Sequence, residues 1–418
     1  MRNTVLSIAL LMVGSQAATA QTVIDTVNTT PAYASNVWYS LENDDQATSL
    51  VNNWHIALAT DMTPSGELIT SALFNHKLGS VYEIPGSNPA NFSTVDTTGL
   101  STWAMLENSE LSWAAGAFNN TANLGTFDYG WGNYNTTTHG IEANRIFVIK
   151  FTAGGYRKLM ISSDNVAGNY TVVHSNLDNS DMTTEVIAVS GYATKNFVYY
   201  NTITKAVLDR EPAKTTWDLY FGQYLTEDQP YPYNLVTGIL QNLNVEVAQV
   251  YPVNDVAAYT NYQAATFEEE MNVFGWDWKS FNGTAYSVAD STVYFVDDVD
   301  GDIWKVVMTG FTGSSQGKYM FSKQKMTSSA GIDENAAGIF ASVYPNPSND
   351  VATVILKNAP AATVSIYSMM GTLVSTQSAD AQNMTAVQLN TAELANGTYH
   401  VVCATGTAVS TQRLVVQH

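Results

Sequence analysis

The chain has 418 residues, and 37 acidic against 17 basic residues give it a formal net charge of −20. This charge repels phosphate backbones and anionic membranes, which excludes nucleic acid as an expected partner. The one cysteine, Cys403, lies near the carboxyl end, so the preceding body has no disulfide, no thiolate metal site and no cysteine nucleophile.

The amino-terminal residues 1–20 have the pattern of a secretory signal peptide. Arg2 precedes an apolar run from Val5 to Val13, and Ala18-Thr19-Ala20 offers a cleavage site with small residues before Gln21. The run is too short to cross a bilayer, and no later apolar run has the length of a membrane helix. We therefore expect export through the Sec machinery and a mature protein that is not membrane-spanning.

The body contains an internal repeat. Trp54, Trp113 and Phe118 recur at an offset of 163 residues, and the run from Ile146 to Lys158 recurs at an offset of 147. These constant offsets predict a first β-rich repeat with its connection at 21–194 and a second repeat at 195–326. The recurring tryptophans are expected to form the core of each copy.

Both copies are expected to be rich in β-strands. Val37-Trp38-Tyr39 and Phe197 to Tyr200 are typical of strands and are predicted to open the two copies. Residues 54–59 alternate at period two, and Gly-rich or Asp-Gly stretches separate the later runs as hairpin turns would. The predicted fold class is all-β: two tandem repeats followed by a small Ig-like β-sandwich.

The change of offset places 16 extra residues in the first copy, around residues 124–139. Aromatic rings on a loop held by glycines can form a stacking platform for a sugar or a flat cofactor. The alternative is a loop that packs its rings back onto the first copy. The candidate ligand-binding residues are Phe127, Tyr129, Trp131, Tyr134 and His139.

Two segments of the body resemble the HmuY-type haem-binding proteins. They are Thr216 to Phe221, with its Trp-Asp pair, and the hairpin from Tyr294 to Val306 around Asp300-Gly301-Asp302. The resemblance implies a β-fold and haem as a candidate cofactor, which needs His or Met axial ligands. The body's histidines are His55, His76, His139 and His174, and none of them maps onto paired ligands of that family.

Asp298, Asp300 and Asp302 are candidate calcium ligands, because carboxylates spaced around a glycine can hold that ion. The stretch lacks the twelve-residue loop and the distal Glu of an EF-hand, so a solvated hairpin tip is the alternative. No catalytic motif is present, and no catalytic residue is assigned. We expect a protein that is not an enzyme; a hydrolase with two carboxylates on separate strands is the weaker alternative.

A small, polar linker at 327–342 precedes a distinct tail at 343–418. The tail opens with Val343-Tyr344-Pro345-Asn346-Pro347, continues through a hairpin with Gly371 at its turn, and closes with Leu394 to Tyr399 and Arg413 to Val416. These four features, in this order, resemble the type A C-terminal sorting domain of the type IX secretion system of Bacteroidetes. The matching signal residues are Tyr344, Pro345, Asn346, Pro347, Gly371, Gly397, Tyr399 and Arg413.

The tail's short runs of Val, Ile, Thr and Tyr between Pro, Gly and Asn breaks independently predict a small antiparallel sandwich. The alternative is an ordinary terminal sandwich used for binding. The resemblance implies recognition by the type IX translocon and sortase, and release outside the cell or attachment to surface lipopolysaccharide. We therefore expect a secreted or surface-attached cargo whose body binds haem or a glycan. The alternative is a structural or adhesive exoprotein without a small ligand.

Overall fold

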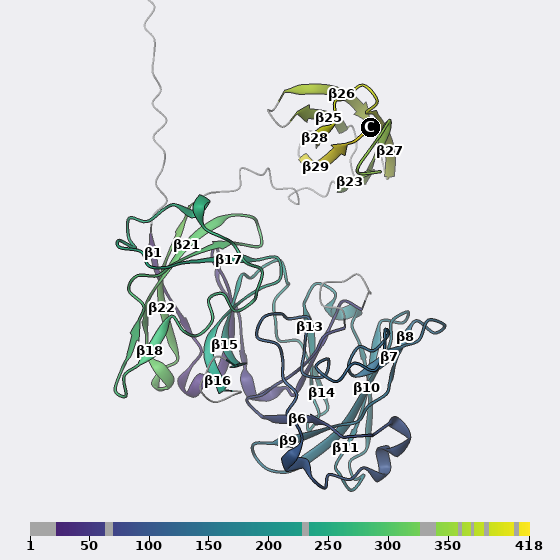
Figure 1. Cartoon of the computed structure of the whole chain (residues 1–418), viewed down its shortest axis with the longest axis vertical. Helices are drawn as coiled ribbons and strands as arrows, with labels where there is room; N and C mark the ends of the chain where they lie inside the picture. The colour runs from purple at the N-terminus through teal and green to yellow at the C-terminus, as the bar shows by residue number, and fades with distance from the viewer. Residues whose placement is uncertain are drawn as a thin grey trace, which may run out of the picture. The chain divides into compact units, whose positions relative to one another are not determined.

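The computed structural model describes residues 22–62, 70–227, 234–326, 340–357, 362–368, 372–379, 384–404 and 409–418. The chain forms two compact units, residues 1–327 and 328–418 (Figure 1). The predicted signal peptide and most of the predicted linker lie outside the described residues. The all-β class is confirmed, since the strands pair antiparallel and the described helices are short 3-10 turns: η1 (Pro31–Tyr33), η2 (Val51–Asn53), η3 (Pro89–Thr94), η4 (Leu100–Thr102), η5 (Ser190–Tyr192), η6 (Tyr262–Ala264) and η7 (Gly313–Ser315).

A first sandwich occupies the middle of the body. Its larger sheet has the order β12-β11-β10-β8-β7, with β9 pairing both β10 and β6, and its smaller sheet has the order β14-β13-β4-β5. One apolar core that includes Ile56, Phe147 and Ile161 fills the space between them. The strands are β4 (Ile56–Ala59), β5 (Ala72–Phe74), β6 (Gly79–Glu83), β7 (Gly132–Tyr134), β8 (Gly140–Ala143), β9 (Phe147–Phe151), β10 (Tyr156–Asp164), β11 (Asn169–Ser175), β12 (Thr183–Ala188), β13 (Phe197–Asn201) and β14 (Ala206–Leu208).

A second sandwich has a corresponding strand order. Its sheets run β1-β22-β21-β20-β17 and β16-β15-β2-β3, and its core includes Val37, Phe221 and Val296. The hairpin β18-β19 lies beside β21. The strands are β1 (Val23–Asn28), β2 (Ser35–Ser40), β3 (Asp44–Leu50), β15 (Leu219–Thr226), β16 (Asn234–Gln241), β17 (Glu246–Val250), β18 (Lys279–Phe281), β19 (Tyr286–Val288), β20 (Val293–Asp297), β21 (Ile303–Phe311) and β22 (Lys318–Lys325).

The first three strands of the chain belong to the second sandwich. β1 pairs with β22, and β2 pairs with β15 in a register that sets Tyr39 opposite Leu219. β13, which was expected to open the second copy, instead pairs with β4 of the first sandwich. The sandwiches therefore divide the body differently from the predicted boundary at residue 194, and the duplication itself stays a prediction from the sequence.

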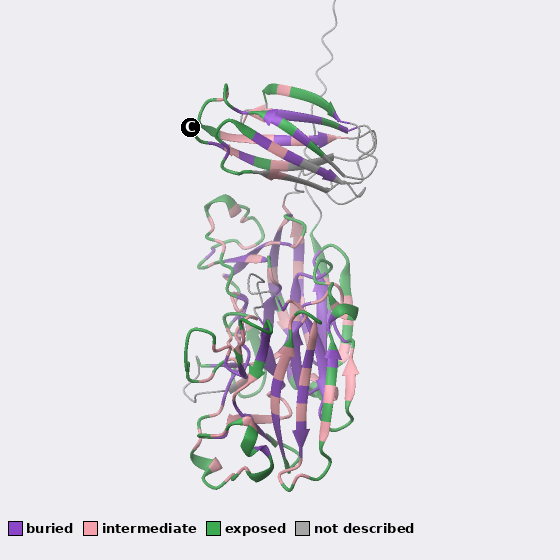
Figure 2. Cartoon of the chain, turned by 90° about the vertical axis from the view of Figure 1, so that its right-hand side faces the viewer, coloured by how far each residue is buried: buried purple, intermediate pink, exposed green. Residues whose placement is uncertain are grey.

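The central strands of the body are buried on both faces. In β4, Ile56 and Leu58 face the core of the first sandwich, whereas Ala57 and Ala59 belong to a separate cluster with Trp38. This junction core lies between the two smaller sheets, and in Figure 2 the buried colour runs along the central strands. Trp54 and Trp217 also lie in the junction core, so the expectation that they fill the cores of the separate copies is wrong.

The second unit consists of two antiparallel sheets around one small core. The sheets run β23-β24-β27 and β26-β25-β28-β29. Val354, Ile366 and the free Cys403 lie in the core between them. The strands are β23 (Phe340–Tyr344), β24 (Val351–Lys357), β25 (Ala362–Ser368), β26 (Leu373–Ala379), β27 (Met384–Asn390), β28 (Gly397–Ala404) and β29 (Val409–Val416). The Ig-like detail of this sandwich stays a prediction.

Candidate functional site

Four of the five predicted ligand-binding residues lie together on the insertion around β7 and β8. The ring centroids of Phe127 and Tyr129 are 6.3 and 6.5 Å from that of Tyr134. The Tyr134 hydroxyl is 2.8 Å from His139 Nδ1. The Phe127 side chain is 52% exposed. These rings form a small aromatic surface, although Tyr129 and Tyr134 also pack against the core of the first sandwich.

Trp131 is a core residue and not part of that surface. Its ring is fully buried beside Tyr170, at a centroid distance of 5.8 Å. Its indole Nε1 donates to the Thr70 carbonyl at 3.1 Å. A ligand can stack on Trp131 only if the core opens, so this position favours the alternative in which the insertion packs one of its rings inward.

A buried ion pair anchors the insertion. Arg145 donates to both carboxylate oxygens of Asp128, at 2.8 and 2.7 Å, and both side chains are 1% exposed. Arg145 also donates to the carbonyls of Gly130 and Ala122, at 2.6 Å each. Burial alone would raise the pKa of Asp128, but the hydrogen bonds from Arg145 and from backbone N–H groups lower it to about 2.

The three predicted calcium ligands have separate structural roles. The Asp298 carboxylate accepts from Trp304 Nε1 at 2.8 Å and from the Asp302 backbone N–H at 2.8 Å. Asp302 pairs with Lys325 at 2.6 Å, and Asp300 is exposed at the turn. No group of three or more His, Cys, Asp or Glu among the described residues could hold a metal ion. The calcium site stays a prediction that this geometry does not support.

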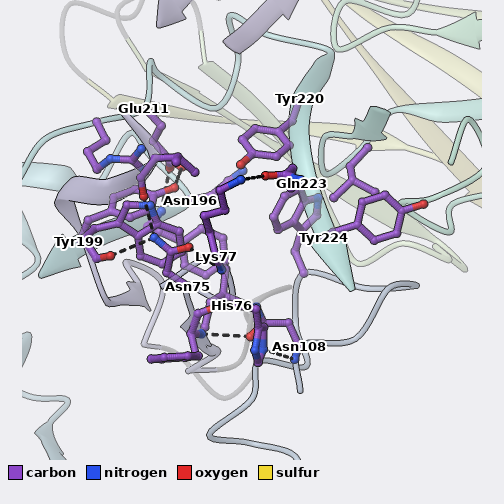
Figure 3. A pocket seen from close by; sticks show the side chains of 18 of the residues that line it. Asn75, His76, Lys77, Asn108, Asn196, Tyr199, Glu211, Tyr220, Gln223 and Tyr224 are labelled. Carbon is purple, nitrogen blue, oxygen red and sulfur yellow. Dashed lines mark hydrogen bonds between the residues drawn. The ribbon is translucent and has the colours of Figure 1, made fainter. Parts of the chain in front are cut away.

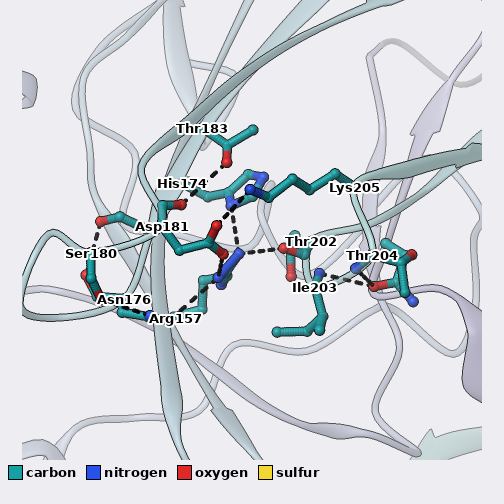
Figure 4. A network of polar contacts seen from close by, with 12 residues as sticks. Arg157, His174, Asn176, Ser180, Asp181, Thr183, Thr202, Ile203, Thr204 and Lys205 are labelled. Atoms are coloured by element: carbon teal, nitrogen blue, oxygen red, sulfur yellow. Dashed lines mark hydrogen bonds and ion pairs between the residues drawn. The ribbon is translucent and has the colours of Figure 1, made fainter.

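Two of the body's histidines, His55 and His174, belong to a buried hydrogen-bond network. Arg157 lies 2.9 Å from His174 Nδ1 (Figure 4). The Tyr200 hydroxyl is 2.9 Å from the His174 Nε2. His55 Nδ1 accepts from the Thr202 backbone N–H at 3.0 Å. Both rings are thus engaged in a buried network that joins β10 and β11 to the β13–β14 turn.

A cavity of about 80 Å³ lies in the junction core, between the smaller sheets of the two sandwiches (Figure 3). Lys77 reaches across it from the first sandwich to Gln223 of β15, at 2.6 Å. Sequence reasoning missed this site, because its residues come from distant segments that share no motif. Its aromatic lining residues are Trp38, Trp54, Phe74, Trp113, Phe197, Tyr199, Trp217, Tyr220 and Tyr224.

Buried polar groups complete the cavity. The Arg210 guanidinium lies over the rings of Tyr199, Trp54 and Trp38, at 4.8, 5.3 and 5.6 Å. The Glu211 carboxyl accepts from the Tyr199 hydroxyl at 2.8 Å, and burial raises its pKa to about 7.

Several buried donors of the lining lack partners. The indole N–H groups of Trp54 and Trp217, together with Arg210 Nε, have no hydrogen-bond partner within the described part of the chain. Buried donors of this kind are rare in folded proteins and call for an explanation, such as a ligand or water that is not part of the chain.

In the second unit, Asn346 links the opening of the tail to its last strand. Its Oδ1 accepts from the Val415 N–H and its Nδ2 donates to the Arg413 carbonyl, both at 2.8 Å. The side chains of Pro345, Pro347 and Arg413 are exposed. The remaining predicted signal residues are spread over the unit: Tyr344 pairs with Thr353, Gly397 begins β28, Tyr399 donates its hydroxyl to the Ala395 carbonyl at 2.9 Å, and Gly371 lies outside the described residues.

Comparison with protein families assigns this unit. Residues 342–417 match the family model described as a secretion system C-terminal sorting domain. The tail is a type IX sorting domain. The chain is therefore cargo of the type IX machinery, and its destination is the extracellular space or the cell surface.

The comparisons say less about the body. No curated protein matches the chain. The resemblance of the body to HmuY-type proteins finds no support here and stays a hypothesis. Among the described residues, no helix is both long and apolar enough to cross a bilayer. The sorting domain thus determines the destination of the protein.

Proposed function

We propose that the body is a non-enzymatic binding module, presented outside the cell, which binds a glycan through the junction cavity. The observation that carries this proposal is the aromatic-lined cavity whose lining includes buried N–H donors without partners among the described residues. Aromatic rings can stack on the apolar faces of a sugar, and N–H groups can donate to its hydroxyl oxygens. The amide side chains of Asn75, Asn108, Asn196 and Gln223 add further polar groups to the lining.

The size of the cavity favours a small group over a tetrapyrrole. About 80 Å³ is far below the roughly 300–1,000 Å³ of typical small-molecule sites. It suits the edge of one sugar ring better than a haem. The described lining contains His76 and Met271 as groups that could ligate haem iron, so it is the small volume that disfavours haem. This volume favours the glycan over haem as the ligand.

The aromatic surface of the insertion remains a second candidate for the same function. Phe127 is exposed and Tyr134 is half-buried there, and a glycan could stack on them without any opening of the core. The two sites lie on different elements, so substitutions can separate them.

A glycan array probed with the full-length secreted protein, followed by calorimetry of any hit, tests the proposal. If the junction cavity binds the glycan, Trp113→Ala and Gln223→Ala should each weaken binding about tenfold or more. Phe127→Ala and Tyr134→Ala should leave binding unchanged. The reverse pattern would assign binding to the insertion surface. Absence of any glycan binding would favour a structural or adhesive exoprotein.

A haem titration provides a direct counter-test. We expect a flat Soret region when haem is added to the full-length protein. A saturable Soret shift that is lost in His76→Ala would contradict the glycan proposal and restore the haem hypothesis.

We also propose the steps of export that surround this function. Residues 1–20 would direct the chain to the Sec machinery. A sortase would then remove the tail and either release the body or join it to surface lipopolysaccharide. These steps follow the behaviour of proteins with type IX sorting domains.

A further inference from the structure

A second pocket lies beside the junction cavity and shares Asn108, Ser109 and Leu225 with it. Its volume is about 320 Å³. One wall is the segment 107–111, and the other is the end of β15 with the following residue. Three carboxylates line it, from Glu107, Glu110 and Glu227, and the described lining contains no lysine or arginine. We call it the acidic pocket.

Glu107 distinguishes this pocket from an ordinary acidic surface. Its side chain is only 8% exposed, and its Oε1 is buried without a hydrogen-bond partner within the described residues. Glu110 differs, since it accepts from the Glu227 N–H at 3.2 Å and from Asn272 Nδ2 at 3.4 Å. A buried carboxyl without a partner costs free energy, and a bound donor would recover it.

The charges around Glu107 favour a cation. Burial and the nearby charge of Glu227 raise the pKa of Glu107 to about 7. Near neutral pH its carboxyl is therefore only partly ionised, and a positive group in the pocket would stabilise the ionised form. The negative charge of the whole chain adds to the attraction.

The composition of the pocket favours an organic cation over a metal ion. Within the described part of the chain, no three carboxylate or imidazole side chains come together in a way that could hold a metal. Leu111, Ala115 and Leu225 give the pocket apolar walls beside its carboxylates. An ammonium group has three N–H donors, and an attached carbon skeleton can pack against such walls.

We propose that the acidic pocket binds the primary ammonium group of an organic cation, such as an amino sugar or a polyamine, with Glu107 as the main carboxylate partner. This site is distinct from the junction cavity and does not depend on the glycan proposal. Glu227 and Glu110 contribute long-range attraction at its rim, and the three apolar side chains exclude water from the ion pair.

Calorimetric titration of the full-length protein at pH 7 tests this site with four probes. Glucosamine represents an amino sugar, and spermidine represents a polyamine. N-acetylglucosamine keeps the same ring without the positive charge, and calcium chloride tests for a metal. We expect binding of glucosamine, spermidine or both that depends on Glu107, with no Glu107-dependent binding of N-acetylglucosamine and no competition from calcium. Tighter binding of glucosamine would indicate an amino sugar as the ligand, and tighter binding of spermidine would indicate a polyamine.

Two matched variants then locate the binding. Glu107→Gln keeps the shape of an uncharged carboxyl, so the fold should survive, and amine affinity should fall about tenfold or more because a charged hydrogen bond is lost. Glu185→Gln, on β12 away from the pocket, should bind as the wild type does. If Glu107→Gln fails to fold, Glu227→Gln removes a rim charge from the same pocket and should also weaken amine binding.

Proton release gives a readout that a purely structural role for Glu107 would not produce. In buffers of different ionisation enthalpy, the wild type should release protons when an amine binds, and Glu107→Gln should release none. Equal amine binding by the wild type and Glu107→Gln would overturn the proposal. So would a loss of N-acetylglucosamine binding in Glu107→Gln equal to the loss of glucosamine binding, or binding of calcium alone.

Discussion

At the scale of single residues, several buried charged side chains of the body are paired with an opposite charge. Arg145 and Asp128 show this most clearly, since each side chain is 1% exposed and the guanidinium contacts both carboxylate oxygens. Removing one partner of such a pair leaves the other buried and uncompensated, which is more costly than removing both.

Arg145→Met should therefore destabilise the body strongly, by about 3–5 kcal/mol in the free energy of unfolding. Urea denaturation followed by tryptophan fluorescence measures this. Lys205→Met is the matched control, because Lys205 pairs with Asp181 at the surface and should contribute less than about 1 kcal/mol. The double variant Arg145→Met, Asp128→Asn should recover part of the loss. Similar effects of Arg145→Met and Lys205→Met would contradict this account.

The buried histidines predict sensitivity to acid. Burial and the charge of Arg157 lower the pKa of both His55 and His174 to about 4, whereas an unfolded histidine titrates near 6.5. Their neutral forms therefore contribute stability above pH 6.5, and this contribution is lost as the pH falls from about 6.5 to 4. Glu211 has the opposite effect on stability. Burial raises its pKa from 4.5 to about 7, so its carboxyl ionises less readily in the folded protein than in the unfolded chain. The folded protein therefore loses stability as the pH rises from about 4.5 to 7.

His174→Gln separates the two effects, because Gln cannot titrate while Glu211 is unchanged. The urea midpoint of the wild type should fall more steeply than that of His174→Gln between pH 6.5 and 4.5. Midpoints measured in steps of half a pH unit would show this. Parallel curves for the two proteins would mean that His174 does not titrate with folding.

At the scale of elements, the exchange of strands holds the two sandwiches together. β1, β2 and β3 pair within the second sandwich, while the rest of the amino-terminal half forms the first. Lys214 and Thr215 are exposed residues in the connection between β14 and β15. A chain cut between them would leave the amino-terminal piece with three strands in the second sandwich.

A protease site inserted between Lys214 and Thr215 tests this arrangement. After cleavage, the two pieces should elute together in size-exclusion chromatography under native conditions and should separate only in denaturant. An inserted site in the linker, after Thr327, is the control and should release the tail at once. Native separation of the two pieces of the body would contradict the strand exchange.

The exchange also marks what the sequence could predict and what it could not. The strands themselves were predictable, because Val37-Trp38-Tyr39 and residues 54–59 have clear strand patterns. The pairing partners of these strands were not predictable. An alternating apolar pattern shows which side chains share a face of a strand, but it does not show which other strand lies beside it. Trp54 and Trp217 were placed in separate cores for that reason, although they lie together in the junction core. Glu107 and Glu227 likewise share a pocket across a long stretch of chain, with no motif to connect them.

At the scale of the whole molecule, the sorting domain is a unit of its own with a separate core. Four features identify it from the sequence, and they follow one another in a fixed order within residues 343–418, which is why this prediction was specific. Asn346, for example, ties the opening motif to the last strand through two hydrogen bonds.

Deletion of residues 342–418 should block export across the outer membrane and leave the body folded in the periplasm. Cell fractionation and surface proteolysis of intact cells measure this. Fusion of residues 327–418 to an unrelated periplasmic reporter should carry that reporter to the surface, which controls for misfolding of the truncated body. Continued surface display of the deleted chain would show that export does not need the tail.

The pairing of β1 with β22 has a consequence for the order of folding. These strands are nearly 300 residues apart, so the sheet that contains them cannot close until almost the entire body has emerged from the ribosome or from a membrane channel. Contacts this distant in sequence form slowly. The first sandwich, by contrast, runs continuously from β4 to β14 and can form early. The second sandwich is therefore expected to complete its sheets after the first, because β1 has no partner strand until β22 has emerged.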